Sequence, residues 1–329
     1  MQNKLEGVGN PGSPHLPSVV SVDGVRWIDY RRTLVPRYSM VWRDIAGCYA
    51  ALALGLAAVL VLDSRAGDAA GWAAAVPAAV WIGYWLHSLF LFGHEAAHRN
   101  LAPRRPWNDR LGDWLVWILY GSTTAEYRRT HMAHHTQLGN HRDPETTYHL
   151  CLSVINILKG LTGVHVLEVM LRNRRNARRA PGGRRQGGGT ALASLRTVAV
   201  HAALLSALVL GGALPAATAW AAGTAAVFPL CALLRTVVEH RHLDAPCETD
   251  FTQVEHGPVN RLFGVGPISR TFGAAGFNRH LLHHWDPAIS YTRFDEMEQF
   301  FLRTPLADRM AESRTSYPAA LKQLIKEAS

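Results

Sequence analysis

The sequence has few cysteines and lacks the motifs of several large protein classes. Its four cysteines form no C-x-x-C pair and show no disulfide spacing: Cys48, Cys151, Cys231 and Cys247. Cys48 and Cys231 lie in apolar runs, which favours inert buried thiols in a reducing environment. Residues 1–40 lack the charged start, apolar core and cleavage site of a secretory signal. The absence of H-P-G-G, of G-x-G-x-x-G after a strand and of C-x-x-C indicates that no electron-transfer domain is fused to the chain.

Long parts of the chain also lack charge. Apolar residues make up 48% of the 329 residues and gather into blocks, while 34 Lys and Arg lie mainly between them. A membrane-spanning helix needs ~20 apolar residues, and four stretches are long enough, at about 43–62, 69–92, 191–214 and 215–238. The sequence therefore predicts an all-α integral membrane bundle of four transmembrane helices with a histidine-rich helical cap.

The basic residues predict how this bundle is oriented. Four spans place residues 1–44, 99–190 and 239–329 on one side, together with nearly all Arg and Lys. The positive-inside rule makes that side cytoplasmic, in a bacterial inner membrane or an equivalent one. We thus expect an N-terminal tail and interfacial segment in residues 1–40 and one membrane domain in residues 41–329. Its cap would comprise residues 93–190 and 239–329, with both termini cytoplasmic.

Three segments outside the spans carry weaker predictions. Residues 1–24, rich in Pro, Gly and Ser, are expected to form a disordered tail. Residues 150–171 are apolar but interrupted by polar side chains, which favours an amphipathic helix at the membrane interface. Residues 172–189 hold many arginines and glycines and are expected to form a flexible connector.

Histidines gather where the predicted spans end. His94 and His98 lie four residues apart in G-H-E-A-A-H-R-N, so a helix places both rings on one face. The spacing H-x-x-H-H, which also puts all three rings on one helical face, occurs twice, and V-V-E-H-R-H lies between the two copies. Neutral imidazoles are good ligands for transition metals. The candidate ligands are His94, His98, His131, His134, His135, His240, His280, His283 and His284.

The three histidine boxes, in this order, resemble those of the membrane fatty-acid desaturase and hydroxylase superfamily. The similarity runs from Gly93 to Pro287 and includes G-H-E-A-A-H-R, H-M-A-H-H followed by H-R-D-P, and F-N-R-H-L-L-H-H-W-D-P. The resemblance implies two iron ions held almost wholly by imidazole in a cytoplasmic cap, with O2 as co-substrate. It also implies one ligand after the last span, for which we choose His240 and keep His242 in reserve.

Other polar residues near these boxes are candidates for orienting the ligand rings. Asp143 and Asn278 recur in the sequence patterns of this superfamily. Glu95 directly follows His94, and Glu239 directly precedes His240. A carboxylate or amide that bonds to a ring nitrogen fixes the orientation of the ring. For Asp143 and Asn278, ordinary capping or turn formation is an equally good interpretation.

Two other functions are compatible with single features of the sequence. H-E-A-A-H matches the zinc protease motif H-E-x-x-H, with Glu95 as general base, so an intramembrane zinc metalloprotease using His94, Glu95 and His98 is an alternative. A protease has no use for two further H-x-x-H-H boxes. A metal transporter would place its ionisable residues within the spans, where only His87 and His201 are candidates. His201 is interpreted as structural. His87 shares a helical face with His94, so it is interpreted as a structural hydrogen-bonded histidine, with the lining of a substrate cavity as the alternative.

The resemblance predicts an oxidoreductase that acts on an unactivated C–H bond of a lipid. Fatty acyl desaturation is the expected reaction, with hydroxylation or oxidative decarboxylation as alternatives at the same site. Electrons would come from a separate ferredoxin, rubredoxin or b-type cytochrome, because no donor domain is fused. The arginines at 128, 129 and 172–185 could dock an acidic donor or bind anionic headgroups. No nucleic acid partner is expected.

Overall fold

The computed structural model describes residues 14–179 and 188–327. This part of the chain is helical, and its β pairing consists of isolated bridges between Val20 and Arg26 and between Leu262 and Arg314. The chain forms two compact units. Within the described chain, unit 1 comprises 14–40, 128–152 and 236–327, and unit 2 comprises 41–127, 153–179 and 188–235.

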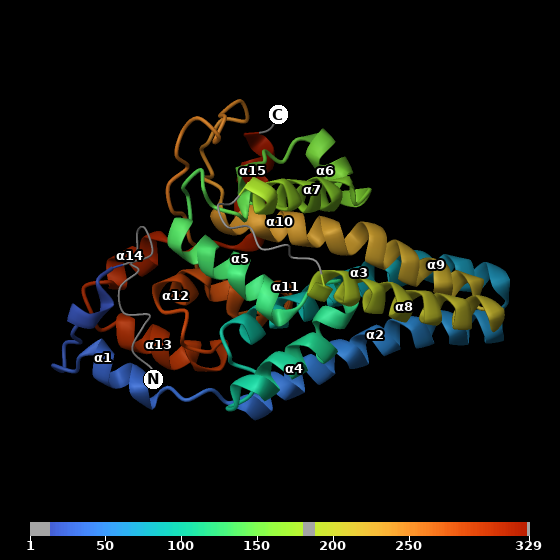
Figure 1. Ribbon diagram of the computed structural model, residues 1–329, viewed down its shortest axis with the longest axis horizontal. Coiled ribbons are helices and arrows are strands. Elements are labelled where there is room, and N and C mark those ends of the chain that lie inside the picture. The colour runs from blue at the N-terminus through green and yellow to red at the C-terminus, as the bar shows by residue number, and fades with distance from the viewer. Residues whose placement is uncertain (1–13, 180–187, 328–329) are drawn as a thin grey trace. The chain divides into compact units, whose positions relative to one another are not determined.

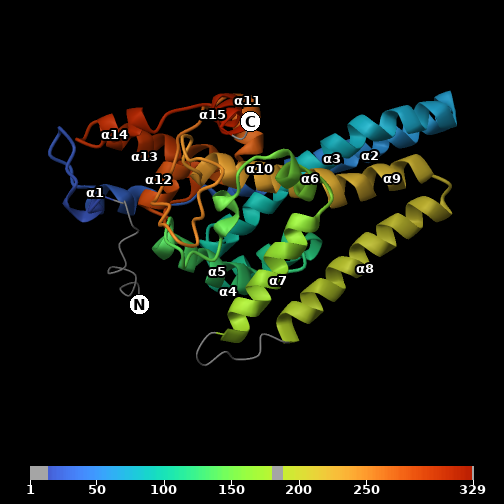
Figure 2. The ribbon, with the colours of Figure 1, turned by 90° about the horizontal axis from the view of Figure 1, so that it is seen from above.

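Unit 2 contains the four helices that are long and apolar enough to cross a membrane, which confirms the predicted spans. The first two are α2 (Tyr38–Ala66) and α3 (Asp68–Ala97), joined by a one-residue turn at Gly67. The third is α8 (Gly188–Leu210). The fourth runs through α9 (Leu214–Ala222), the π-helical turn η5 (Gly223–Val227) and α10 (Phe228–His240), whose last residues belong to unit 1. Helices α2, α3 and α9 run side by side in both views (Figures 1 and 2).

Small residues let α3 pack closely against its neighbours. A Cβ at Gly55 on α2 would lie 2.7 Å from the indole of Trp81 on α3, whose Nε1 donates to the carbonyl of Ala51 at 2.7 Å. A Cβ at Gly223, the first residue of η5, would lie 2.9 Å from the carbonyl oxygen of Ala79. As a result, 61% of the most apolar stretch of α3 is buried inside the protein, whereas only 6% of the corresponding stretch of α8 is buried. Helix α3 is therefore the central helix of unit 2.

The connections in unit 2 differ in part from the sequence predictions. After α3 come α4 (Arg105–Leu115) and the 3₁₀ turn η3 (Trp117–Leu119). The single helix expected over residues 150–171 is two helices, α6 (Val154–Leu161) and α7 (Val164–Arg179), bent by 88°. Gly163 at the bend has φ +70°, which a continuous helix does not allow. The sequence predicts a flexible connector from residue 172 onward, and this prediction is wrong as far as Arg179, where α7 ends. Residues 180–187 lie outside the described chain.

Unit 1 is built from short helices around an aromatic core, in which Trp27, Phe294, Phe300 and Phe301 are fully buried. The indole of Trp27 donates to Asp286 at 3.0 Å. The disordered tail predicted for residues 1–24 is wrong from Pro14 onward, because Leu16 packs into this core, while residues 1–13 lie outside the described chain. The helices are η1 (Leu16–Ser18), α1 (Trp27–Tyr30), η2 (Arg31–Thr33), α5 (Thr124–Gln137), η4 (Thr146–His149), α11 (Pro267–Phe272), η6 (Ala274–Arg279), α12 (His280–Trp285), η7 (Tyr291–Arg293), α13 (Phe294–Phe301), α14 (Ala307–Glu312) and α15 (Tyr317–Lys326).

A disulfide joins two loops of unit 1. It links Cys151, after η4, to Cys247, after α10, a pairing that the spacing of the cysteines in the sequence does not indicate. The two residues are 96 positions apart, and only the folded loops bring them together. Arg241 spans the same loops, donating to the carbonyls of His149 at 2.6 Å and Pro246 at 3.1 Å. Cys48 and Cys231 are free thiols, as the sequence predicts.

Candidate metal centre

Seven of the predicted ligands lie in unit 1, on three short stretches of helix. Helix α5 carries the first H-x-x-H-H box, α12 carries the second, and His240 is the last residue of α10. All seven side chains are buried: His131, His134, His135, His240, His280, His283 and His284. Helical spacing turns the histidines of each box to one side, so the rings of the three stretches meet within unit 1.

Four of these histidines form one group. The Nε2 atom of His280 lies 3.0 Å from Nε2 of His240 and 3.1 Å from Nε2 of His284. His134 completes the group, and one ring nitrogen from each of the four lies within 4.8 Å of the others. All four histidines belong to unit 1, so the folding of this unit is sufficient to form the group.

The other three histidines of unit 1 form a second convergent arrangement. Nε2 of His135 lies 3.0 Å from Nε2 of His131 and 2.8 Å from Nε2 of His283. The rings of His135 and His284 are in contact at 4.5 Å between centroids, so this arrangement lies beside the group of four. Unit 1 therefore brings together two sets of imidazole nitrogens.

His94 and His98 lie in unit 2, at the end of α3. Their ring centroids are 4.6 Å apart, as expected for residues four apart on one helical face. The buried side chain of Asn108 holds the turn that follows: its Nδ2 donates to the carbonyl of Ala96 at 2.8 Å, and its Oδ1 accepts from the amide of Leu101 at 2.9 Å. Asn108 thus fixes the backbone on both sides of His98.

Hydrogen bonds at Nδ1 set the tautomers of three rings. Nδ1 of His134 donates to the carboxylate of Asp143 at 2.9 Å, and Nδ1 of His131 donates to Glu145 at 3.1 Å. Nδ1 of His240 donates to the carbonyl of Val259 at 2.8 Å. Each of these bonds places the ring proton on Nδ1, so the neutral ring presents a lone pair at Nε2.

Lone pairs that face one another at about 3 Å repel unless a cation lies between them. Nε2 of His131 and Nε2 of His240 each lie 3.0 Å from the Nε2 atom of another buried histidine, and ring nitrogens that converge in this way fit a site for metal ions. The electrostatics agree, since burial and then the neighbouring ring of His135 hold the pKa of His284 well below its usual range. His284 is therefore neutral, which is the form that binds metal. Borderline transition metals such as iron and zinc suit imidazole ligands.

Carboxylates and a tyrosine hold the ligand rings in place. Asp143, predicted as a possible partner, accepts from His134 and also from the amide of Glu145 at 2.8 Å. Glu145 and Tyr148 were not predicted from the sequence. The Tyr148 hydroxyl is fully buried and donates to Asp143 at 2.7 Å, and it accepts from the amide of Gly139 at 2.8 Å. Burial and then the charge of Asp143 raise the pKa of Tyr148, so the hydroxyl keeps its proton.

The structure separates the other predicted residues by role. The side chain of Asn278 donates to the carbonyl of Gly264 at 3.3 Å, 14 positions earlier in the chain, so it links two segments of unit 1. Glu95 and Glu239 are both buried, in unit 2 and unit 1 respectively. His242 is exposed, and its ring lies tilted against that of His256, at 4.8 Å between centroids, whereas His240 joins the group of four.

One of the two histidines within the spans, His201, has the structural contacts that the sequence predicts. His201 on α8 lies 3.1 Å from the carbonyl of Leu119 and accepts from the indole of Trp220 at 3.0 Å, so it connects α8 to η3 and α9. His87 is fully buried on α3. Neither residue belongs to a group of potential metal ligands in the described chain.

A Gly139→Ala substitution should destabilise unit 1 by about 2–4 kcal/mol, from a clash added to backbone strain. Gly139 has φ +80°, and a Cβ at this position would overlap the carbonyl group of Gly257. The amide of Gly257 donates to the Gly139 carbonyl at 3.0 Å, so neither backbone segment can move away freely. We expect a lower thermal midpoint in detergent, together with a loss of bound metal.

The matched control is Gly24→Ala in the same unit. Gly24 has φ +78°, but a Cβ there would meet no atom within 4 Å. This variant has the backbone strain without the steric clash, so it should lower the free energy of unfolding by about 1–2 kcal/mol. Equal midpoints for the two variants would show that the contact between Gly139 and Gly257 does not constrain the fold.

The described chain thus combines four apolar helices long enough to cross a membrane with buried clusters of histidine, and comparisons with known proteins show its family. The model of the fatty acid desaturase family matches residues 70–312. This match covers more than half of the chain, so the chain belongs to the fatty acid desaturase family. The family match also explains why the histidine boxes recur with fixed spacings.

Relatives are also found among characterised proteins. Two β-carotene ketolases from Paracoccus strains are 35% and 33% identical to the chain over 63 residues. The matched segment covers 18% of this chain and 26% of each ketolase, so the similarity spans about a quarter of the length of these relatives.

Proposed function

We propose that the protein uses O2 and two iron ions to oxidise an unactivated C–H bond of a lipid, with fatty acyl desaturation as the reaction. One iron would be held by His134, His240, His280 and His284. The other would be held by His131, His135 and His283, with His94 and His98 from the end of α3 as further ligands. The observation that carries the proposal is the convergence of Nε2 atoms in unit 1, 2.8–3.1 Å apart, in a chain of the desaturase family.

When bound, the two irons would supply the activation of O2 and the removal of hydrogen from carbon. The chain holds the ligands in the form that this requires. Asp143 and Glu145 accept the Nδ1 protons of His134 and His131, which keeps Nε2 free of a proton and fixes each ring plane. Tyr148 holds Asp143 in turn, and its buried hydroxyl excludes water from that carboxylate.

The substrate is proposed to be hydrophobic because unit 2 consists of apolar helices that meet the length needed to span a bilayer. A lipid dissolved in the bilayer would approach from between such helices. A fatty acyl chain fits the family best. Hydroxylation and oxidative decarboxylation are alternatives at the same ligand set, since placement of the carbon relative to the oxidant decides among these outcomes.

A second candidate is oxygen insertion into a carotenoid-like polyene. The 35% identity to a β-carotene ketolase over 63 residues favours it, since that name describes oxidation of a long hydrocarbon. The two candidates predict different products and the same metal content.

The proposed orientation places the histidines and both termini on the cytoplasmic side. The positive-inside rule supports it, because Lys and Arg concentrate outside the apolar helices. Electrons would arrive from a separate ferredoxin, rubredoxin or b-type cytochrome. Arg128 and Arg129 on α5, and Arg172 on α7, are candidate docking residues for an acidic donor, whereas 180–185 lie outside the described chain.

Metal analysis of the purified membrane protein tests the centre. We expect about two irons per chain, whereas one zinc per chain would favour the metalloprotease alternative at His94, Glu95 and His98. The protease requires none of the seven histidines in unit 1. A protein that binds no iron under reducing, anaerobic reconstitution would overturn the proposal.

Product mass tests the reaction. The protein is incubated with donor, reductase, O2 and mixed acyl lipids, and in parallel with β-carotene. Loss of two hydrogens identifies desaturation, and gain of one oxygen identifies hydroxylation. A mass change confined to β-carotene would assign the carotenoid candidate, and no O2-dependent change in either substrate class would contradict both.

A further inference from the structure

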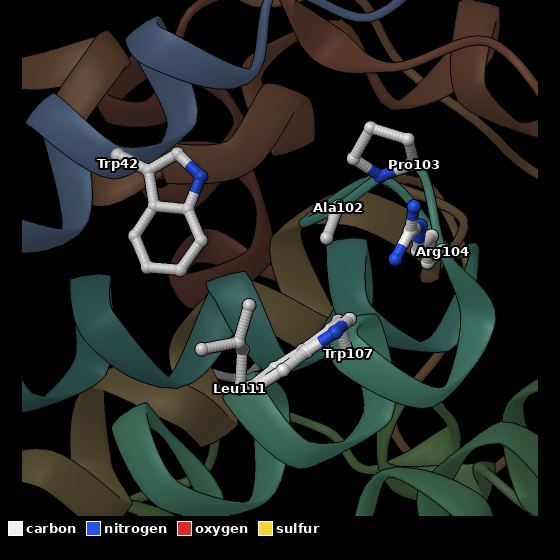
Figure 3. A pocket seen from close by; sticks show the side chains of 6 residues that line it. All are labelled: Trp42, Ala102, Pro103, Arg104, Trp107 and Leu111. Atoms are coloured by element: carbon white, nitrogen blue, oxygen red, sulfur yellow. The ribbon is translucent and has the colours of Figure 1, made fainter.

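A pocket of about 380 Å³ lies within unit 2. Its walls come from the start of α2, the segment that follows α3, and α4, and none of its lining residues is a histidine. Figure 3 shows the indole of Trp42 across the pocket from Leu111 and Trp107, with Arg104 beside Pro103. The lining residues are Trp42, Ala102, Pro103, Arg104, Trp107 and Leu111.

The connectivity of the spans gives the depth of this pocket in a bilayer. Helix α2 crosses from Tyr38 to Ala66, and α3 returns from Asp68 to Ala97, so the start of α2 and the end of α3 lie at the same end of the hairpin. Trp42 is in the first two turns of α2, and α4 begins shortly after α3 ends. The pocket therefore lies at the membrane–water interface, where tryptophan is enriched.

Exposed arginines surround the apolar walls. Arg104, Arg105 and Arg110 are exposed and form no ion pair with any residue in the described ranges. The guanidinium of Arg110 lies over the ring of Trp107, 5.6 Å from its centroid, and Trp107 is itself half exposed. A basic rim on an aromatic, apolar wall matches the two parts of a phospholipid, a phosphate and the beginning of an acyl chain.

We propose that this pocket binds one anionic phospholipid of the bilayer, with its phosphate at Arg104 and its first acyl carbons between Trp42, Trp107 and Leu111. The pocket opens at the level where headgroups lie, which favours a lipid over a soluble ligand. The unpaired basic rim favours an anionic headgroup, because a zwitterionic one would bring a second cation beside Arg104. This site requires neither iron nor oxidation, so it stands apart from the proposed function.

Native mass spectrometry of the detergent-solubilised full chain tests the site. The protein is titrated with phosphatidylglycerol or with phosphatidylcholine of the same acyl chains, and the lipid retained per chain is measured. We expect preferential retention of one phosphatidylglycerol. Arg104→Gln should lower its apparent affinity about fivefold, the effect of one basic residue at an anionic membrane surface. Arg104→Lys should keep most of the preference, and Trp107→Ala should weaken retention of both lipids.

Arg65→Gln is the matched control. Arg65 is an exposed arginine at the opposite end of the same helical hairpin, so its loss changes the net charge equally and leaves the pocket intact. Its retention should equal that of the wild type. Equal retention of the two lipids by the wild type, or equal losses in Arg65→Gln and Arg104→Gln, would overturn the proposal. Iron content measured on the same samples should stay constant, which separates this result from the metal centre.

Discussion

His134→Ala should abolish activity, with turnover falling by more than the 10–100-fold that loss of an outer partner typically costs. His134 is buried, its Nδ1 proton is held by Asp143, and its Nε2 is presented to the group formed with His240, His280 and His284. Alanine removes one ligand nitrogen from this group, and Asp143 loses the hydrogen bond that it accepts from Nδ1 of His134. Iron content and product formation should fall together, measured on the same membrane preparation.

The matched control for this prediction is His242→Ala. His242 lies two residues from His240, but its ring is exposed and lies against His256. Its replacement should leave turnover within about twofold of the wild type, as for most surface substitutions. An inactive His242→Ala variant beside an active His240→Ala variant would reverse the choice between these two residues. A largely active His134→Ala variant would remove His134 from the ligand set.

Asp143→Asn should lower iron affinity and turnover by about 10–100-fold, the usual cost of losing a partner that orients a metal ligand. The carboxylate accepts from three donors: Nδ1 of His134, the hydroxyl of Tyr148 and the amide of Glu145. Asparagine offers one oxygen, and its amide group would face a donor. We therefore expect the ring of His134 to lose its fixed orientation. Competition with a chelator measures the affinity, and product formation measures the turnover.

Two variants show whether the effect comes from this contact. Tyr148→Phe removes one donor and keeps the carboxylate, so its effect should be smaller than that of Asp143→Asn. Asp295→Asn is the control. The side chain of Asp295 is 73% exposed and forms an ion pair with Arg279, and exposed ion pairs contribute little to stability. The prediction fails if Asp295→Asn and Asp143→Asn have the same chelator sensitivity.

The sequence predicts the spans because an apolar run of sufficient length has few alternatives. All four predicted spans are present, and the fourth is interrupted by the π-helical turn η5. The prediction failed where local composition was the only guide. The segment that follows Pro14 is ordered because Leu16 packs into a hydrophobic core whose members lie mainly between Leu262 and Met310, far away in the sequence.

The sequence identified only some of the residues that form hydrogen bonds with the histidine rings. Asp143 was a candidate because it follows the second histidine box. From the sequence alone, however, turn formation was as good an interpretation of Asp143 as a bond to a ligand ring. Glu145 and Tyr148 lie in the same short segment, where Glu145 precedes the 3₁₀ helix η4 and Tyr148 belongs to it. The spacing of an α-helix does not predict how this segment turns them toward His131 and Asp143. A carboxylate soon after a histidine box was the available clue for Glu145.

By itself, the sequence determined the all-α class, the four spans and which histidines share a helical face, because these properties depend on hydrophobic length and on a repeat of 3.6 residues. The tertiary structure decided which histidines meet, which ring nitrogens keep a lone pair, and that Cys151 pairs with Cys247. Those properties depend on contacts between loops distant in the chain. Their geometry is set by packing in three dimensions, which no local spacing encodes.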